Sequence, residues 1–135
     1  MTLVLTNEQA SLWVRWIHTL RLGHDPLNPG SEYRQGTDSL RCDGGYCCLG
    51  VACDLVDPDG WGYVDDGRDS FITFDGDQME VPTRVRLAFG VDELETGWNG
   101  WTPGDRAISN LNDFGSSFPE IADIIEARLM TAVVR

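Results

Sequence analysis

Two adjacent cysteines, Cys47 and Cys48, are the residues of this sequence that are best suited to chemistry. They follow Gly44 and Gly45, which favour a sharp turn because glycine readily adopts a positive φ. Apolar residues then recur at helical spacing as far as Leu55, so the stretch predicts a turn that leads into a buried helix. The dipole of a helix stabilises a thiolate at its N-terminus. One hypothesis is therefore a cysteine-dependent hydrolase or transferase that uses Cys47 or Cys48.

Such an enzyme also needs a general base and an orienting group. Asn112 or Asp113 could orient the base, but the two histidines, His18 and His24, both precede the cysteines. We expect His18 to lie within the first helix and His24 in a loop, so neither is a good base. Buried structural cysteine is the preferred interpretation, because small apolar side chains suit a tight helix start. The catalytic candidates of the enzyme hypothesis are Cys47, Cys48 and Asp113.

Metal and cofactor motifs do not fit the sequence. The four cysteines, Cys42, Cys47, Cys48 and Cys53, lack the paired C-x2-C spacing that is typical of zinc sites. The aspartates of residues 57–69 do not match a calcium-binding loop. The sequence has no phosphate-binding glycine motif and no lysine for a Schiff base. We therefore predict no metal and no cofactor.

A second set of polar and aromatic residues could bind a ligand instead. Asn110 and Asn112 lie between the last two predicted helical segments, and we expect them to cap a helix and to stabilise turns. Ligand binding is the alternative role for these two residues. Two tryptophans fall in the Gly-rich stretch 92–106, which we predict to be a long surface loop. The ligand-binding candidates are Tyr46, Asn110, Asn112, Asp113, Trp98 and Trp101.

The helices that must position these residues have clear start signals. Capping boxes at Thr6–Gln9 and Ser117–Glu120 predict the starts of the first and last helices. Trp13 and Trp16 lie on the inner face of the first helix and are expected to anchor the core. The predicted helices are 7–22, a cysteine helix that ends before Asp57, a short helix between Pro82 and Gly90, one or two turns over 105–113, and a C-terminal helix that runs to Leu129.

Short β-prone runs predict two hairpins. The first joins Tyr33–Gln35 to Ser39–Arg41, and the second joins Phe71–Phe74 to Asp77–Val81 through an Asp75–Gly76 turn. Residues 57–69 are predicted to be a solvated acidic loop. The expected fold is α+β, with a single domain over residues 1–135 and three main helices packed on a small antiparallel sheet of hairpins.

Composition restricts the classes of partner. The chain has 135 residues, 22 of them acidic and 10 basic, for a net charge of −12. Such a surface repels nucleic acid and anionic membranes, so we predict no direct binding to either. The sequence shows no signal peptide and no run of transmembrane length, which favours a soluble cytoplasmic protein with reduced thiols.

Several blocks of the sequence resemble a family of small proteins of unknown function that occur in bacteriophages and prophages, especially those of actinobacteria. These blocks are Tyr33–Gly36, Ser39–Arg41, Tyr46–Leu55, Leu111–Asp113 with Gly115, and Ser117–Glu126. The chain departs from the family by a longer insertion, Gly23–Ser31. The resemblance implies origin and a shared fold, and it brings no activity with it.

The preferred functional hypothesis is therefore a non-enzymatic accessory protein of phage type. It would bind a host protein or sequester a small molecule, as a counter-defence or host-takeover factor does. The alternatives are the cysteine-dependent enzyme described above and an acidic inhibitor that mimics DNA, which the charge of −12 suggests. The preference rests on analogy and on the incomplete catalytic set.

Overall fold

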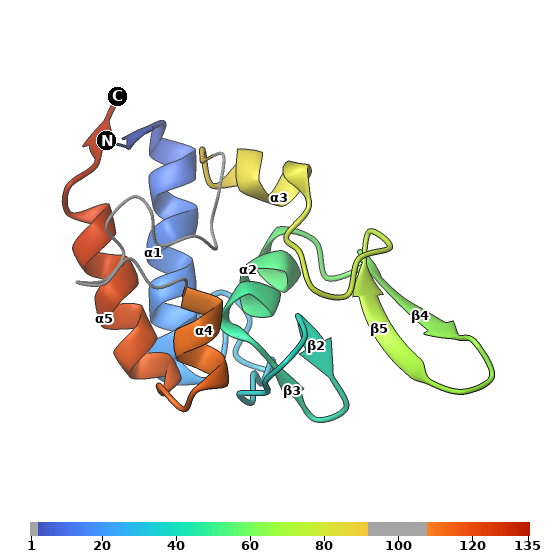
Figure 1. Ribbon diagram of the computed structural model, residues 1–135. Coiled ribbons are helices and arrows are strands. Elements are labelled where there is room, and N and C mark those ends of the chain that lie inside the picture. Colours follow the sequence, from blue (N-terminus) through green and yellow to red (C-terminus); the bar gives the residue numbers. More distant parts are fainter. Residues whose placement is uncertain (1–2, 92–107) are drawn as a thin grey trace.

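The computed structural model of the protein describes residues 3–91 and 108–135, and this part of the chain combines helices with short strand pairs (Figure 1). Its helices are α1 (Asn7–Leu22), α2 (Cys48–Val56), α3 (Thr83–Ala88), α4 (Ile108–Asp113) and α5 (Phe118–Leu129). Its strands are β1 (Val4–Leu5), β2 (Arg41–Cys42), β3 (Gly45–Tyr46), β4 (Trp61–Asp65), β5 (Ser70–Phe74) and β6 (Val133–Val134). The predicted α+β class is confirmed.

Helix α1 begins and ends as its sequence predicts. The Thr6 hydroxyl accepts a hydrogen bond from the Gln9 backbone N–H at 3.1 Å, and the Gln9 side chain accepts one from the Thr6 backbone N–H at 2.9 Å. Gly23 ends the helix with a φ of 78°, which glycine adopts without strain. The second capping box, at Ser117, starts α5 in the same way. Both predicted capping boxes are therefore confirmed.

Aromatic side chains at the centre of α1 organise the core. Trp13 and Trp16 are fully buried and pack edge-to-face against each other and against Phe89, which follows α3. The Trp13 indole N–H donates to the Phe89 carbonyl at 2.8 Å, and the Trp16 indole N–H donates to the Cys48 carbonyl at 2.9 Å. Each tryptophan thus buries a large ring and also satisfies its polar atom. Their predicted role as core anchors is confirmed.

The expectation of three main helices is met only in part. The described residues form five helices, of which α1, α2 and α5 have seven residues or more. Helices α3 and α4 have six residues each and are followed by glycines with positive φ, Gly90 and Gly115. Residues 105–107 of the predicted helix 105–113, and the predicted loop 92–106 with Trp98 and Trp101, lie outside the described residues.

The pairing predicted for the first hairpin is wrong. Strand β2 pairs with β3 across a two-residue turn, Asp43–Gly44, and the segment around Gln35 contributes only an isolated bridge to Tyr46. The reason is a close backbone contact: a Cβ atom on Gly45 would lie 2.8 Å from the Gly36 nitrogen. Two glycines therefore let the segment before β2 lie against β3, where the Gly36 N–H donates to the Tyr46 carbonyl at 2.7 Å.

The second predicted hairpin also has a different partner. Strand β5 pairs with β4, which lies inside the stretch that was expected to be an acidic loop. The Asp75–Gly76 turn does form, with φ values of 52° and 86°. Beyond it, the Asp77 carboxylate accepts hydrogen bonds from the backbone N–H groups of Met79 and Glu80, both at 2.9 Å. These bonds fold the chain into a turn where a strand was expected.

The hairpins do not form one sheet, and each two-stranded pair stands alone. The third pair joins β1 and β6 in parallel, which brings the two ends of the chain together (Figure 1). The Val133 N–H donates to the Leu3 carbonyl at 2.8 Å. Two-residue strands carry too little sequence pattern to be predicted.

Candidate binding site

The cysteine segment forms a tightly packed helix start. The Cys47 sulfur caps α2 and accepts a hydrogen bond from the Gly50 backbone N–H at 3.3 Å. The Cys47 N–H donates to the Leu40 carbonyl at 3.1 Å, so the residues before β2 cross directly over the helix. A Cβ atom on Gly50 would lie only 1.7 Å from the Leu40 carbonyl oxygen. Glycine is therefore required at position 50.

The thiols of α2 are shielded from solvent. Cys48 and Cys53 have no exposed surface, and burial raises the pKa of both thiols above the usual value because it disfavours the charged thiolate. The Cys48 thiol lies 3.9 Å from the Ile108 carbonyl oxygen, its hydrogen-bond acceptor. These surroundings favour neutral thiols that serve as small core residues.

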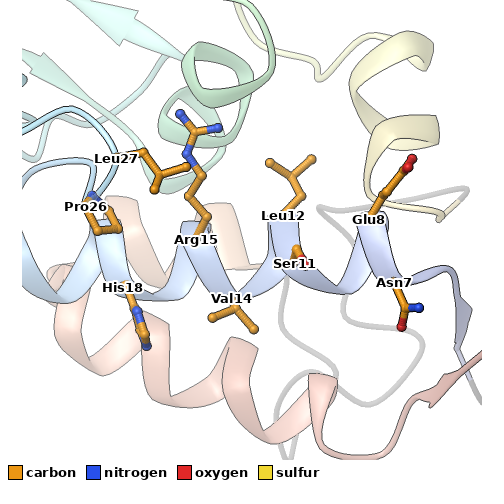
Figure 2. Close-up of a pocket in the computed structure, with 9 residues that line it drawn as sticks. All are labelled: Asn7, Glu8, Ser11, Leu12, Val14, Arg15, His18, Pro26 and Leu27. Atoms are coloured by element: carbon orange, nitrogen blue, oxygen red, sulfur yellow. The ribbon is translucent and has the colours of Figure 1, made fainter.

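The histidines lie elsewhere. His18 is exposed on α1, and Figure 2 shows it pointing toward α5, with α2 on the other side of α1. His24 lies in the loop after α1, next to Asp25. Within the described residues, neither histidine therefore lies where it could act as a hydrogen-bonded base for the cysteines.

Thiol labelling provides a direct test of this arrangement. We expect iodoacetamide to modify Cys42 in the native protein, because Cys42 is half-exposed and the other three cysteines are buried. Cys48 and Cys53 should react only after denaturation. Peptide mapping by mass spectrometry at several labelling times measures the order of reaction. Rapid modification of Cys48 in the native state would contradict the buried-thiol interpretation.

Asn112 joins three segments through its buried amide. Its carbonyl oxygen accepts hydrogen bonds from the Gln35 amide at 3.1 Å and from the Cys48 backbone N–H at 3.3 Å. Its amide nitrogen donates to the Gly36 carbonyl at 2.7 Å. The Asp113 carboxylate accepts from the Asp38 backbone N–H at 3.0 Å. Two predicted site residues, Asn112 and Asp113, are therefore occupied in holding the fold together.

A row of aromatic rings connects the two hairpins to α2. Tyr33, Tyr46, Trp61 and Phe74 contact one another in sequence edge-to-face, with ring centroids 5.1, 5.9 and 5.0 Å apart. The Asp54 carboxylate on α2 accepts hydrogen bonds from the Tyr33 hydroxyl and, at 2.8 Å, from the Trp61 indole N–H. Burial, and then the bond to Asp54, raise the pKa of Tyr33 above its usual value. The row is thus fixed by packing and by hydrogen bonds.

Arg41 covers the outer side of this row. Its guanidinium carbon lies 4.7 Å from the centre of the Tyr46 ring and 5.3 Å from the Trp61 ring, in cation–π geometry. Within the part of the chain that the structure describes, the guanidinium makes no ion pair and no hydrogen bond. Tyr46, a predicted ligand-binding residue, therefore lies beside a cation that the sequence analysis did not single out.

Two adjoining hollows, of about 230 and 320 Å³, open beside Arg41. Arg41, Cys42, Asp43 and Ile72 line both of them. We call the pair the hairpin cleft, because its walls come from the β2–β3 and β4–β5 hairpins. Its other polar lining includes Ser39, Tyr63, Ser70 and Gln78 in the first hollow and Glu32 and Arg34 in the second.

The β4–β5 hairpin beyond the cleft extends away from the helices (Figure 1). Only its base is anchored, where Phe74 is fully buried. Farther out, Tyr63 is 66% exposed, and Met79 beside the hairpin base is 54% exposed. The loop between the strands, residues 66–69, is exposed and carries Asp66, Asp69 and one arginine, Arg68.

A larger hollow of about 640 Å³ lies along α1 (Figure 2). Its lining is mostly apolar and includes Leu12, Val14 and Leu27. Its arginine, Arg15, forms a two-point ion pair with the buried carboxylate of Asp25, which lowers the pKa of that carboxyl group. The charge of Arg15 is therefore already used within the protein.

The described residues also lack two other features. No three His, Cys, Asp or Glu side chains among them come together in a way that could hold a metal ion. None of their helices is both long enough and apolar enough to cross a membrane.

The fold and its cleft define a small α+β protein in which two separate hairpins are fixed to a helical core. The chain belongs to the family described as a domain of unknown function, DUF8296, whose family model matches residues 10–129. No curated protein matches the chain, and no solved structure does.

Proposed function

We propose that the chain is a non-enzymatic accessory protein of bacteriophage type that binds a host protein through its β4–β5 hairpin. One observation carries the proposal: this hairpin presents exposed apolar side chains while it projects from the helices. The phage origin rests on the sequence resemblance described above.

The exposure of the hairpin supports a role in binding. Isolated two-stranded hairpins are marginally stable in water, and most of β4 buries little surface against the core. Tyr63 and Val64 are nevertheless exposed on it, with Met79 exposed nearby. Apolar groups rimmed by polar residues are typical of protein interaction sites, and tyrosine is enriched in them. A partner that covers these side chains would stabilise the hairpin.

Charge indicates the kind of partner. The tip of the hairpin carries three aspartates, Asp65, Asp66 and Asp69, against one arginine, Arg68, and the whole chain has a net charge of −12. Such a surface accelerates association with a basic protein surface and disfavours a second copy of the same chain. We therefore expect a host protein whose contact surface is apolar at the centre and basic at the rim.

The thiol environment supports binding over catalysis. Cys48 is buried, with its thiol pKa raised, and Cys47 uses its sulfur to cap α2. Asn112 and Asp113, the predicted orienting groups, already bond to backbone atoms of other segments. A cysteine nucleophile would need the opposite surroundings, namely access to substrate and a stabilised thiolate.

Affinity capture from an actinobacterial lysate tests the proposal with three forms of the protein. The double variant Tyr63→Ser/Val64→Thr removes the apolar contacts, and Leu87→Ser removes from α3 an apolar residue about as exposed as Tyr63, as a control. We expect mass spectrometry to identify a basic host protein that the wild type and Leu87→Ser retain and the double variant loses. Circular dichroism confirms that all three forms are folded.

The proposal is wrong if the double variant retains every protein that the wild type captures. A captured DNA-binding protein that duplex DNA displaces, and that ignores the hairpin substitutions, would favour the DNA-mimic alternative instead.

A further inference from the structure

We infer that the hairpin cleft binds the carboxylate or phosphate group of a small polar ligand through Arg41. This inference concerns a small-molecule site and does not require the partner protein proposed above, although Tyr63 belongs to both surfaces. It begins from the unusual situation of the Arg41 side chain.

Arg41 differs from the arginines that serve the fold. Ion pairs with carboxylates hold Arg15, Arg21, Arg34 and Arg84. The chain has 22 acidic residues for 10 basic ones, so carboxylate partners are abundant. Arg41, like the exposed Arg68 and Arg135, forms no ion pair with any described residue, and unlike those two it lies on two aromatic rings.

Stacking prepares the guanidinium to bind an anion. The faces of Tyr46 and Trp61 restrict its orientation, and Asp54 fixes Trp61 in turn through the indole N–H. A stacked guanidinium keeps its edge N–H groups available, and they match the two oxygens of a carboxylate or phosphate. Part of the entropy cost of ordering the arginine is therefore met before a ligand arrives.

The cleft supplies further polar groups at the same place. Tyr63, Ser70 and Gln78 line the 230 Å³ hollow with Arg41. Their side chains make no hydrogen bonds to the described residues, so a ligand could use them. A hollow of this size suits a small molecule, since sites for drug-sized ligands start at about 300 Å³.

Asp43 adds a constraint on the ligand. Its side chain lines both hollows, and its carboxylate repels a simple anion. We therefore expect a ligand that also carries hydroxyl or amine donors, which can face Asp43. For a simple anionic probe, removal of the Asp43 charge should strengthen binding.

Inorganic phosphate and acetate are suitable probes, and the Trp61 indole N–H signal in ¹H–¹⁵N NMR is the readout, because this ring lies under Arg41. We expect a saturable shift with at least one probe, and the responding probe identifies the preferred anion.

Arg41→Gln should raise Kd by about tenfold or more, since a charged hydrogen bond contributes about 1.5–3 kcal/mol. Asp43→Asn should lower Kd, and Arg135→Gln, which replaces an exposed arginine that does not line the cleft, should change it less than twofold.

The inference fails if neither probe gives a saturable shift. It also fails if Arg135→Gln weakens binding as much as Arg41→Gln, because the attraction would then be general to positive charge. Arg41→Lys keeps the charge without the planar fork, and it should bind more weakly than the wild type while its unfolding temperature shows that the cleft is intact. Equal affinity of Arg41→Lys and the wild type would contradict the two-point contact.

Discussion

Replacement of Gly50 by alanine is expected to prevent the chain from folding stably. The new Cβ would lie 1.7 Å from the Leu40 carbonyl oxygen and 2.7 Å from the Leu40 carbonyl carbon. Both are backbone atoms, so no side-chain rotation can relieve the overlap. Relief would require α2 to separate from the segment before β2, with loss of the hydrogen bond from the Cys47 N–H to Leu40. We expect a loss of more than about 4 kcal/mol in the free energy of unfolding.

Urea unfolding followed by circular dichroism measures this effect, with Gly30→Ala as the matched control. At Gly30 the nearest atom to the new Cβ is the Asn28 side-chain oxygen at 3.7 Å, an ordinary contact distance. The control should therefore change the free energy of unfolding by less than about 1 kcal/mol. If Gly50→Ala is as stable as Gly30→Ala, the proposed crossing of Leu40 over α2 is wrong.

Replacement of Asn112 by alanine should produce the second-largest loss. The substitution removes one acceptor and one donor and leaves the Cys48 N–H, the Gly36 carbonyl and the Gln35 amide without their Asn112 bonds. At about 1 kcal/mol for each hydrogen bond, we expect the free energy of unfolding to fall by about 3 kcal/mol.

Asn110→Ala is the control for this prediction, since Asn110 is exposed on the same short helix. It should lower the free energy of unfolding by less than about 0.5 kcal/mol. Asn112→Asp keeps an acceptor for the Gln35 amide and the Cys48 N–H, but it places a carboxylate oxygen against the Gly36 carbonyl, so we expect it also to lower the free energy of unfolding. Comparable stability of Asn112→Ala and Asn110→Ala would show that the buried amide contributes little.

Local signals in the sequence were sufficient for the helices. The capping boxes at Thr6 and Ser117 and the glycines that end the helices act within a few residues, so spacing alone reveals them. Strand pairing was less predictable, because it depends on contacts between distant segments. Gly45 lies against Gly36, and the Asp77 carboxylate accepts a hydrogen bond from the Met79 backbone N–H. Neither contact changes the β-propensity of the neighbouring residues.

The candidate site was predicted only in part. The sequence predicts Tyr46 as a ligand-binding residue, and in the structure it lines the cleft. The sequence predicts Arg41 only as a strand residue, because its isolation from carboxylates depends on the three-dimensional arrangement of the chain. One feature of the sequence does point to Arg41, namely its position in the short turn Arg-Cys-Asp-Gly-Gly-Tyr. Such a turn brings charged and aromatic side chains close together.

The distribution of the four thiols gives the hairpin cleft a natural attachment point for a reporter group. Cys42 lines both hollows and is half-exposed, while the remaining cysteines are buried. A thiol-reactive fluorophore added to the unaltered chain would therefore attach beside Arg41 and Asp43. Its emission would respond to occupancy of the cleft, which allows a library of small molecules to be screened without any engineered residue.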